Sequence, residues 1–242
     1  MLSGITYNVF LGMSLKSLLT WLYTENELLD FYCFQEFPEH KIPDLKVYLD
    51  KLGYDFQFAS GFIRQGISYG ELTAFKRSNL KLLRTEIISL GGKDEKTVVF
   101  THQGLKLFRV DKMEIDKSAL LTSFRYKGHD LMLVNAHLST DLHNIRKLEQ
   151  LGVILGTLST AAPAVILGDF NYATGRRKLT KTMGAHEFRS GLQKQKTFRF
   201  APGISWQNDY IFQRGCEAKD VSIKHVPHPD HYPVFFKLVL PD

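Results

Sequence analysis

The sequence predicts an α/β fold of two packed sheets flanked by helices, and three observations support this. Strand-like runs of β-branched and aromatic residues recur along the chain, separated by short joints rich in Gly and Asn. Three other segments repeat apolar residues at helical spacing. No linker-like stretch divides the 242 residues. We therefore expect a single domain over residues 1–242.

The first two helical segments carry apolar residues at i, i+3, i+4 and i+7, and the third is marked by Ile145, Leu148, Gly152 and Leu155. Ser14 is a suitable N-cap for the first helix, and Gly53 stops the second. The third ends before Ala162-Pro163. The helices are expected around Leu15–Leu22, Leu45–Leu52 and Ile145–Leu155.

Strands and helices alternate early in the chain, and strands dominate later. Asp30–Phe37 is near-continuously apolar and Ala164–Leu167 is predicted to be a further buried strand, so we expect both inside packed sheets. The predicted strands are Ile5–Val9, Asp30–Phe37, Tyr54–Ser60, Glu71–Lys76, Leu80–Ser89, Thr97–Val110, Ala119–Tyr126, Leu131–Leu138, Ala164–Leu167, Asp209–Gln213, Val221–His225 and Val234–Leu240.

Composition excludes several classes of protein. The chain is 44% hydrophobic and 23% charged, without repeats or low-complexity tracts. Its two cysteines, Cys33 and Cys216, have neither zinc spacing nor a disulfide framework. No apolar run reaches transmembrane length, and no leader pattern opens the chain. We expect a reduced, cytoplasmic monomer; export without a leader stays open.

Positive charge is concentrated in one segment. The net charge is +6, and residues 176–199 carry eight Lys and Arg side chains against one acid, Glu187. Such a run is commonly a solvated loop. Here it follows Gly168-Asp169-Phe170-Asn171, which favours a role facing a phosphate-bearing substrate. Arg176, Arg177 and Lys178 are the candidate substrate-binding residues.

Polar side chains gather at the ends of the predicted strands. Each alone has a structural explanation, such as a turn cap, a solvated strand end or a hydrogen-bonded core imidazole. Together they suit attack of water on a phosphate ester, since carboxylates hold Mg²⁺ and an imidazole can transfer a proton near neutral pH. The residues are Asn8, Glu36, Asn135, His137, Asp169, Asn171, Asp209, Asp230 and His231.

Six segments in order resemble the endonuclease/exonuclease/phosphatase superfamily, which has the deoxyribonuclease-I-like fold. The resemblance covers nearly the whole chain. It implies a four-layer α-β-β-α sandwich of two mostly antiparallel sheets, and a metal-dependent hydrolase of phosphoric esters. The segments are Thr6-Tyr7-Asn8, Phe34-Gln35-Glu36, Asn135-Ala136-His137-Leu138-Ser139, Gly168-Asp169-Phe170-Asn171, Asn208-Asp209-Tyr210-Ile211-Phe212 and Asp230-His231-Tyr232-Pro233-Val234.

The resemblance also implies a metal site. Glu36 would be the principal ligand of Mg²⁺, for which Mn²⁺ can substitute. Asn8 and Asp230 would complete the metal region. Asp169 and Asn171 would orient the attacking water and bind the phosphate.

Two histidines have implied catalytic roles. His231, oriented by Asp209, would be the general base or a stabiliser of the transition state. His137 marks the branch that holds deoxyribonuclease I, neutral sphingomyelinases, deadenylases and inositol-polyphosphate phosphatases. The family pattern pairs this histidine with a glutamate, and Glu71 is the expected partner.

Two positions depart from the family pattern. Pro229 stands where a Ser usually precedes the Asp-His pair, which removes a backbone donor and a hydroxyl. Gln207-Asn208 stands where many members have Arg-Ile. Neither change affects a proposed catalytic atom, so we expect activity to be retained. The two changes put the contacts with the substrate in doubt.

A nuclease is the first hypothesis for the substrate, because aromatic residues interleave with the basic segment and could stack on bases. A sphingomyelinase-like or inositol-phosphate phosphoesterase is the alternative. An inactive binding module ranks third, because every catalytic position is filled. Endonuclease and exonuclease action stay equally open. The aromatic residues are Phe188, Phe198, Phe200 and Trp206, and a small core under the loop is the alternative for Phe198 and Phe200.

Overall fold

The computed structural model describes residues 1–9, 29–91, 96–99, 109–112, 114–140, 144–201, 203–226 and 230–241. The helix expected at Leu15–Leu22 lies outside these ranges, as does Pro229. The other two predicted helices are present, and so are the strands apart from the Thr97–Val110 segment.

Two large sheets form the body of the molecule. Among the described neighbours, β1–β2 and β10–β11 are parallel and the remaining pairs are antiparallel, as expected. The first sheet has the order β16 (Glu217–Ile223), β17 (Val234–Val239), β1 (Leu2–Asn8), β2 (Phe31–Pro38), β4 (Ile67–Lys76), β3 (Tyr54–Arg64) and β8 (Glu114–Ile115). The second has the order β12 (Arg189–Ser190), β15 (Asp209–Arg214), β11 (Ala164–Asp169), β10 (His129–His137), β9 (Ser118–Tyr126) and β5 (Lys81–Ser89).

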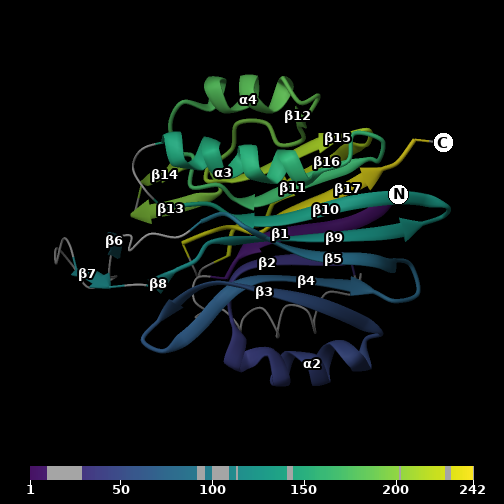
Figure 1. Ribbon diagram of the computed structural model, residues 1–242, viewed down its shortest axis with the longest axis horizontal. Helices are drawn as coiled ribbons and strands as arrows, with labels where there is room; N and C mark the ends of the chain where they lie inside the picture. The colour runs from purple at the N-terminus through teal and green to yellow at the C-terminus, as the bar shows by residue number, and fades with distance from the viewer. Residues whose placement is uncertain are drawn as a thin grey trace.

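Helices cover both outer faces, which completes the predicted four layers (Figure 1). A short 3₁₀ turn, Glu39–Lys41, leads into α2 (Ile42–Lys51), which lies on the first sheet. On the second sheet lie α3 (Asn144–Thr157) and α4 (Arg176–Gly184). Among the described helices, none is long and apolar enough to cross a membrane.

Two segments differ from the sequence prediction. Thr97–Val110 is not one strand: β6 (Lys96–Val99) pairs antiparallel with β7 (Arg109–Lys112). The basic segment 176–199 is not a loop throughout, because it begins with α4 and ends in β13 (Phe198–Ala201), which pairs with β14 (Ile204–Trp206). Helix α4 escaped prediction because Leu179 and Met183 are its buried residues and the rest of it is polar.

An amide pair joins the two sheets. Asn135 Nδ2, on β10, donates to the carbonyls of Phe34 (3.0 Å) and Leu72 (3.1 Å) on the opposite sheet. Asn135 Oδ1 accepts a hydrogen bond from Gln35 Nε2 at 2.7 Å. Asn135 therefore holds the sheets together at this end of the sandwich, which explains its place among the strand-end polar residues.

The same inner faces continue into the candidate site. Alternate residues of a strand point to the same side of a sheet. Leu131, Leu133 and Asn135 face the inner layer, so the next inner position of β10 is His137. The same alternation places Asp169 after Val165 and Leu167 on β11. Strand pairing sets Asp169 beside both His137 and Asp209.

Candidate active site

A β-bulge turns Glu36 into the site. The β2–β4 register shifts between Phe34 and Phe37, and both phenylalanines pack under α2. Two residues therefore occupy the inner side between them, where a regular strand would have one. Gln35 takes the contact with Asn135, and Glu36 adopts a φ of +55° that is strained for a residue other than glycine. The bulge brings the Glu36 carboxylate to Asn8, whose Nδ2 donates to Oε1 at 3.2 Å.

Asp169 is the centre of the cluster. Its Oδ2 accepts a hydrogen bond from Asn8 Nδ2 at 3.0 Å, and its Oδ1 accepts one from the backbone N–H of Asn171 at 2.9 Å. Gly168, with φ of +128°, lets the chain pass close to β10: a Cβ there would lie 2.0 Å from the Ala136 carbonyl oxygen. Burial raises the pKa of Asp169 to about 6, although the His231 imidazole lowers it.

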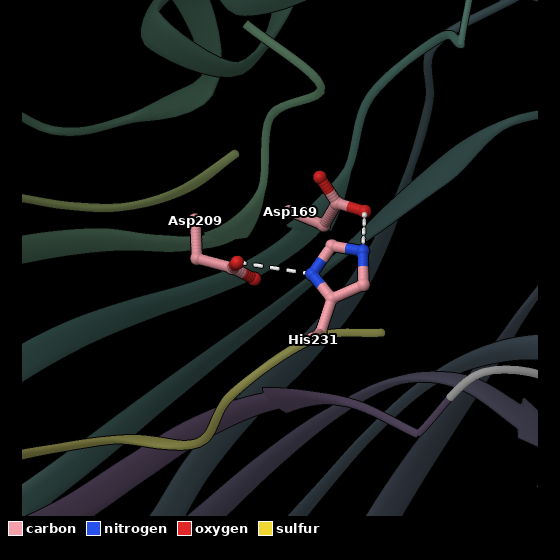
Figure 2. Close-up of side chains that lie close together, drawn as sticks. All are labelled: Asp169, Asp209 and His231. Carbon is pink, nitrogen blue, oxygen red and sulfur yellow. Dashed lines mark hydrogen bonds and ion pairs between the residues drawn. The ribbon is translucent and has the colours of Figure 1, made fainter. Parts of the chain in front are cut away.

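His231 lies between two carboxylates (Figure 2). Its Nδ1 is 3.0 Å from Asp209 Oδ2, and its Nε2 is 3.4 Å from Asp169 Oδ2. Burial alone lowers the pKa of His231, but the charges of Asp209 and Asp169 outweigh it and raise the pKa to about 10. The predicted Asp209–His231 pair is present, and its imidazole is a cation at neutral pH.

His137 has the opposite environment. Its Nε2 lies 3.7 Å from both Glu36 Oε1 and Asp169 Oδ2, while its Nδ1 lies 3.2 Å from Nζ of Lys117. Burial, followed by the charge of Lys117, holds the pKa of His137 well below its ordinary value. This imidazole is therefore neutral near pH 7.

The predicted pairing of Glu71 with His137 is not found in the structure. Glu71 is fully buried, and its Oε2 lies 3.2 Å from Ser118 Oγ. Burial raises the pKa of this carboxyl to about 8, although Lys117 lowers it. The reason for the difference is Lys117, which occupies the Nδ1 side of the ring where a carboxylate was expected.

The predicted metal ligands form the partly exposed side of the cluster. Glu36 and Asp230 are half-buried, and burial raises the pKa of both carboxyls. Oδ1 of Asp230 is buried and makes no hydrogen bond within the described residues. Two desolvated carboxylates with an unsatisfied oxygen, next to an amide side chain, fit a hard divalent cation.

A second group could also hold a cation by geometry. Ligand atoms of Asp169, Asp209 and His231 all lie within 4.8 Å of one another. Both ring nitrogens of His231 already contact the two carboxylates, so this imidazole has no nitrogen left to bind an ion, although Asp209 Oδ1 is buried and makes no hydrogen bond within the described residues. Glu36 and Asp230 are therefore the better candidates for cation ligands.

The β13–β14 hairpin holds the segment that carries His231. Oγ1 of Thr197, just before β13, accepts hydrogen bonds from the backbone N–H groups of Asn208 and Asp209, each at 3.0 Å. The Thr197 carbonyl accepts one from Tyr232 N–H at 2.7 Å. Thr197 therefore positions both members of the Asp209–His231 pair, a role that its sequence context does not indicate.

The two residues that replace the family's Arg-Ile make short-range hydrogen bonds between the same hairpin and β15. Gln207 Nε2 donates to the Asp209 carbonyl at 3.1 Å. Asn208 Oδ1 accepts a hydrogen bond from Trp206 Nε1 at 2.9 Å.

The aromatic and basic residues of segment 176–206 lie in three environments: the core, a half-buried aromatic cluster and the first turn of α4. Phe188 is 1% exposed and belongs to the core under α3 and α4, so the idea that it stacks on bases is wrong. Phe198, Phe200 and Trp206 form a half-buried cluster, in which the Phe198 ring meets His231 edge-on at 4.8 Å. In the first turn of α4, Arg177 and Lys178 are exposed, while Arg176 donates to the Leu192 carbonyl at 2.8 Å.

Sequence reasoning missed Lys117, although strand register contains a signal for it. The turn at Lys127-Gly128 pairs Tyr126 with His129, and counting outward from it pairs Ala119 with Ala136. Lys117 therefore falls beside the end of β10, where His137 lies. The position of Lys117 directly before a buried strand therefore predicts a lysine next to His137.

Buried carboxylates, two imidazoles and oriented amides at the ends of two packed sheets define a site for phosphate-ester hydrolysis. A model of the Endonuclease/Exonuclease/phosphatase family matches residues 5–235. The chain belongs to this family, whose members hydrolyse phosphoester bonds, and it is accordingly a phosphoric ester hydrolase. No curated protein sequence matches the chain.

Solved structures share the fold. An endonuclease/exonuclease/phosphatase from Bacteroides vulgatus aligns with a TM-score of 0.74 at 18% identity, covering 99% of both chains. ANGEL2, described as a 2',3'-cyclic phosphatase in complex with adenosine-2',3'-vanadate, aligns with a TM-score of 0.75 at 16% identity, covering 99% of this chain and 95% of its own. D. rerio TDP2 complexed with single strand DNA product aligns with a TM-score of 0.69 at 17% identity, covering 98% of each chain.

Proposed function

We propose that this protein is a Mg²⁺-dependent phosphodiesterase that acts on nucleic acid. The observation that carries the proposal is the convergence on Asp169 of Asn8 from one sheet, His137 from the other and His231 from the loop before β17. The family match over residues 5–235 supports a single domain for the whole activity. Both cysteines are free, which supports the predicted cytoplasmic setting; we propose a monomer.

The proposed roles follow from charge and exposure. Glu36, Asp230 and Asn8 would hold the cation, which when bound supplies Lewis acidity at the phosphate oxygens. Asp169 orients the attacking water and accepts its proton, as its pKa of about 6 allows. His231, a cation between two carboxylates, stabilises charge developing on the phosphate and is not the general base. Asn171, half-buried at the edge of the cluster, contacts the phosphate.

Two features of the rim support a nucleic acid as substrate. The first turn of α4 carries Arg176, Arg177 and Lys178. The N-terminus of a helix is itself partly positive, so these side chains add to a positive potential that a bound anion would neutralise. The aromatic cluster of β13 and β14 lies against His231 and offers a surface for bases. Two neighbours of the same fold are complexed with a nucleotide analogue and with a DNA product.

Removal of Glu36 tests the metal-dependent mechanism. We expect Glu36→Gln to abolish Mg²⁺ binding measured by calorimetry and to reduce turnover to background, because the amide removes the negative charge. Chelation of the wild-type protein should stop turnover, and Mg²⁺ or Mn²⁺ should restore it. Exposed Glu39→Gln, three residues away, is the matched control and should behave as wild type.

The substrate is tested with single-stranded and duplex DNA, RNA, cyclic nucleotides, inositol phosphates, sphingomyelin and a small chromogenic phosphodiester. We expect the highest kcat/KM on an oligonucleotide. A preference for inositol phosphate or sphingomyelin would reject nucleic acid, and full activity of Glu36→Gln in chelator would reject the mechanism.

A further inference from the structure

A cation lies at the inner nitrogen of His137. Nζ of Lys117 is 3.2 Å from His137 Nδ1. An ammonium group has three donors and no acceptor, so Nδ1 must accept the hydrogen bond. A neutral imidazole whose Nδ1 is an acceptor carries its hydrogen on Nε2.

The other nitrogen faces the centre of the site. His137 Nε2 is buried and makes no hydrogen bond within the described part of the chain. It lies 3.7 Å from Glu36 Oε1 and 3.7 Å from Asp169 Oδ2, too far for a strong bond to either. An N–H group in this place is a donor without a partner, directed to where the substrate phosphate is proposed to bind.

Lys117 is held in place by its surroundings. It is 2% exposed, and its ammonium lies over the Phe62 ring at 5.2 Å from the centroid. The Phe62 ring meets His137 edge-on at 6.2 Å. The next residue, Ser118, donates to the Ser60 carbonyl at 2.8 Å, which fixes the start of β9. The lysine cannot swing away from His137 without disturbing these contacts.

We propose that Lys117 is a positioning residue that fixes the Nε2–H tautomer of His137 and so makes this imidazole a neutral hydrogen-bond donor to a phosphate oxygen. The part played by the phosphate rests on the function proposed above. The pairing of Lys117 with His137 does not depend on it, so the two can be tested separately.

The tautomer is tested by ¹⁵N NMR of the protein with labelled histidine, in Mg²⁺ buffer at neutral pH. His137→Gln identifies the His137 signals by their loss. We expect wild-type His137 to show an unprotonated Nδ1 and a protonated Nε2. Lys117→Met should convert these signals to those of a mixture of tautomers, and Lys117→Arg, which retains a donor, should preserve them. Lys147→Met, at another buried lysine, is the control and should leave them unchanged.

Kinetics with the best substrate add a second measurement. We expect Lys117→Met to lower kcat by about 10–100-fold, the range seen when the hydrogen-bond partner of a metal-ligating histidine is removed, with little change in KM. Lys117→Arg should recover most of this loss. Full turnover of Lys117→Met with an unchanged His137 spectrum would overturn the proposal, as would a wild-type spectrum with the hydrogen on Nδ1.

Two further outcomes are decisive. If no phosphate ester is hydrolysed, the proposed function fails while the spectrum still decides the pairing. If Lys117→Met does not fold, the wild-type and Lys117→Arg spectra decide it instead.

Discussion

The two histidines of the site occupy opposite electrostatic environments. His231 has a carboxylate at each ring nitrogen, and its pKa rises to about 10. His137 has an ammonium group at Nδ1, and its pKa falls well below the ordinary value. Both rings lie near the same oxygen, Asp169 Oδ2, at 3.4 and 3.7 Å. One is a cation and the other is neutral, within a single cluster.

The comparison shows that the charge of the partner at Nδ1 determines whether each imidazole is a cation or neutral near pH 7. In sequence the two histidines look alike, since each follows or precedes an apolar strand at its end. Asp209 enters from β15, and Lys117 enters from the residue before β9. Each partner comes from a strand neighbouring β10 or β11, so sheet register selects the charge of each ring.

Among changes to the surroundings of the two histidines, cutting the Asp209–His231 pair should have the largest effect on activity. We expect Asp209→Asn to reduce kcat by roughly 10⁴-fold, as in other Asp–His pairs, because the ring loses its charge and its orientation. Asp220→Asn is a matched exposed control, in a left-handed conformation that asparagine tolerates, and should keep wild-type turnover. Near-normal turnover of Asp209→Asn would show that His231 acts without its carboxylate.

The pH dependence of stability should differ in direction between the two histidines. Charged His231 stabilises the fold below the unfolded pKa, about 6.5, and this contribution is lost as pH rises toward 10. Neutral His137 stabilises the fold above about 6.5, and this contribution is lost as pH falls. The free energy of unfolding of His231→Gln should therefore rise relative to that of wild type as the pH increases from about 8.5 to 9.5. That of His137→Gln should rise relative to wild type as the pH decreases from about 6 to 5.

Denaturant unfolding in chelator measures both differences, because a bound cation would alter the charges. The alkaline window begins at about pH 8.5, above the pKa of about 8 for Glu71, which also changes stability as it ionises. The slope of each difference can reach about 1.4 kcal/mol per pH unit. Slopes of the same sign for both variants would contradict the comparison.

The basic rim should have the smallest effect on chemistry, since it lies outside the cluster that the histidines share. Arg177 and Lys178 are exposed, so we expect their double replacement by Gln to flatten the dependence of log affinity for DNA on log salt. The slope should fall by roughly 0.7–0.9 for each phosphate that is no longer neutralised. Turnover of a small chromogenic phosphodiester should barely change. Adding Arg176→Gln should flatten the slope further, but it also removes the hydrogen bond to Leu192.

The matched control for the rim is Lys46→Gln with Lys51→Gln, which removes the same charge from exposed positions of α2 on the opposite outer layer. It should leave the salt dependence unchanged. Equal effects of the two double variants would mean that net charge alone attracts DNA.

Most of the fold could be predicted because its strands are runs of β-branched and aromatic residues separated by short joints rich in Gly and Asn. Helix α4 could not, since two buried residues, Leu179 and Met183, are too few for a helical pattern. The pairing of β6 with β7 was missed because an apolar run does not show where it turns back.

The site was predicted where it depended on strand ends and missed where it depended on pairing register. Asn8, Asp169, Asp209 and His231 meet as expected. The partner of His137 was missed because Glu71 lies in the first sheet and Lys117 precedes β9 in the second. Local sequence gives the register of a hairpin such as β9–β10, but it does not show which strands of two separate sheets face each other.

The bulge at Glu36 has an evolutionary consequence. With two inward positions between Phe34 and Phe37, β2 supplies both an amide for the sheet–sheet contact and a carboxylate for the reaction. A chain one residue shorter here would have one inward position, which could hold either the amide or the carboxylate but not both. A single-codon deletion in β2 is therefore a direct route from an enzyme to an inactive scaffold with the same hydrophobic core.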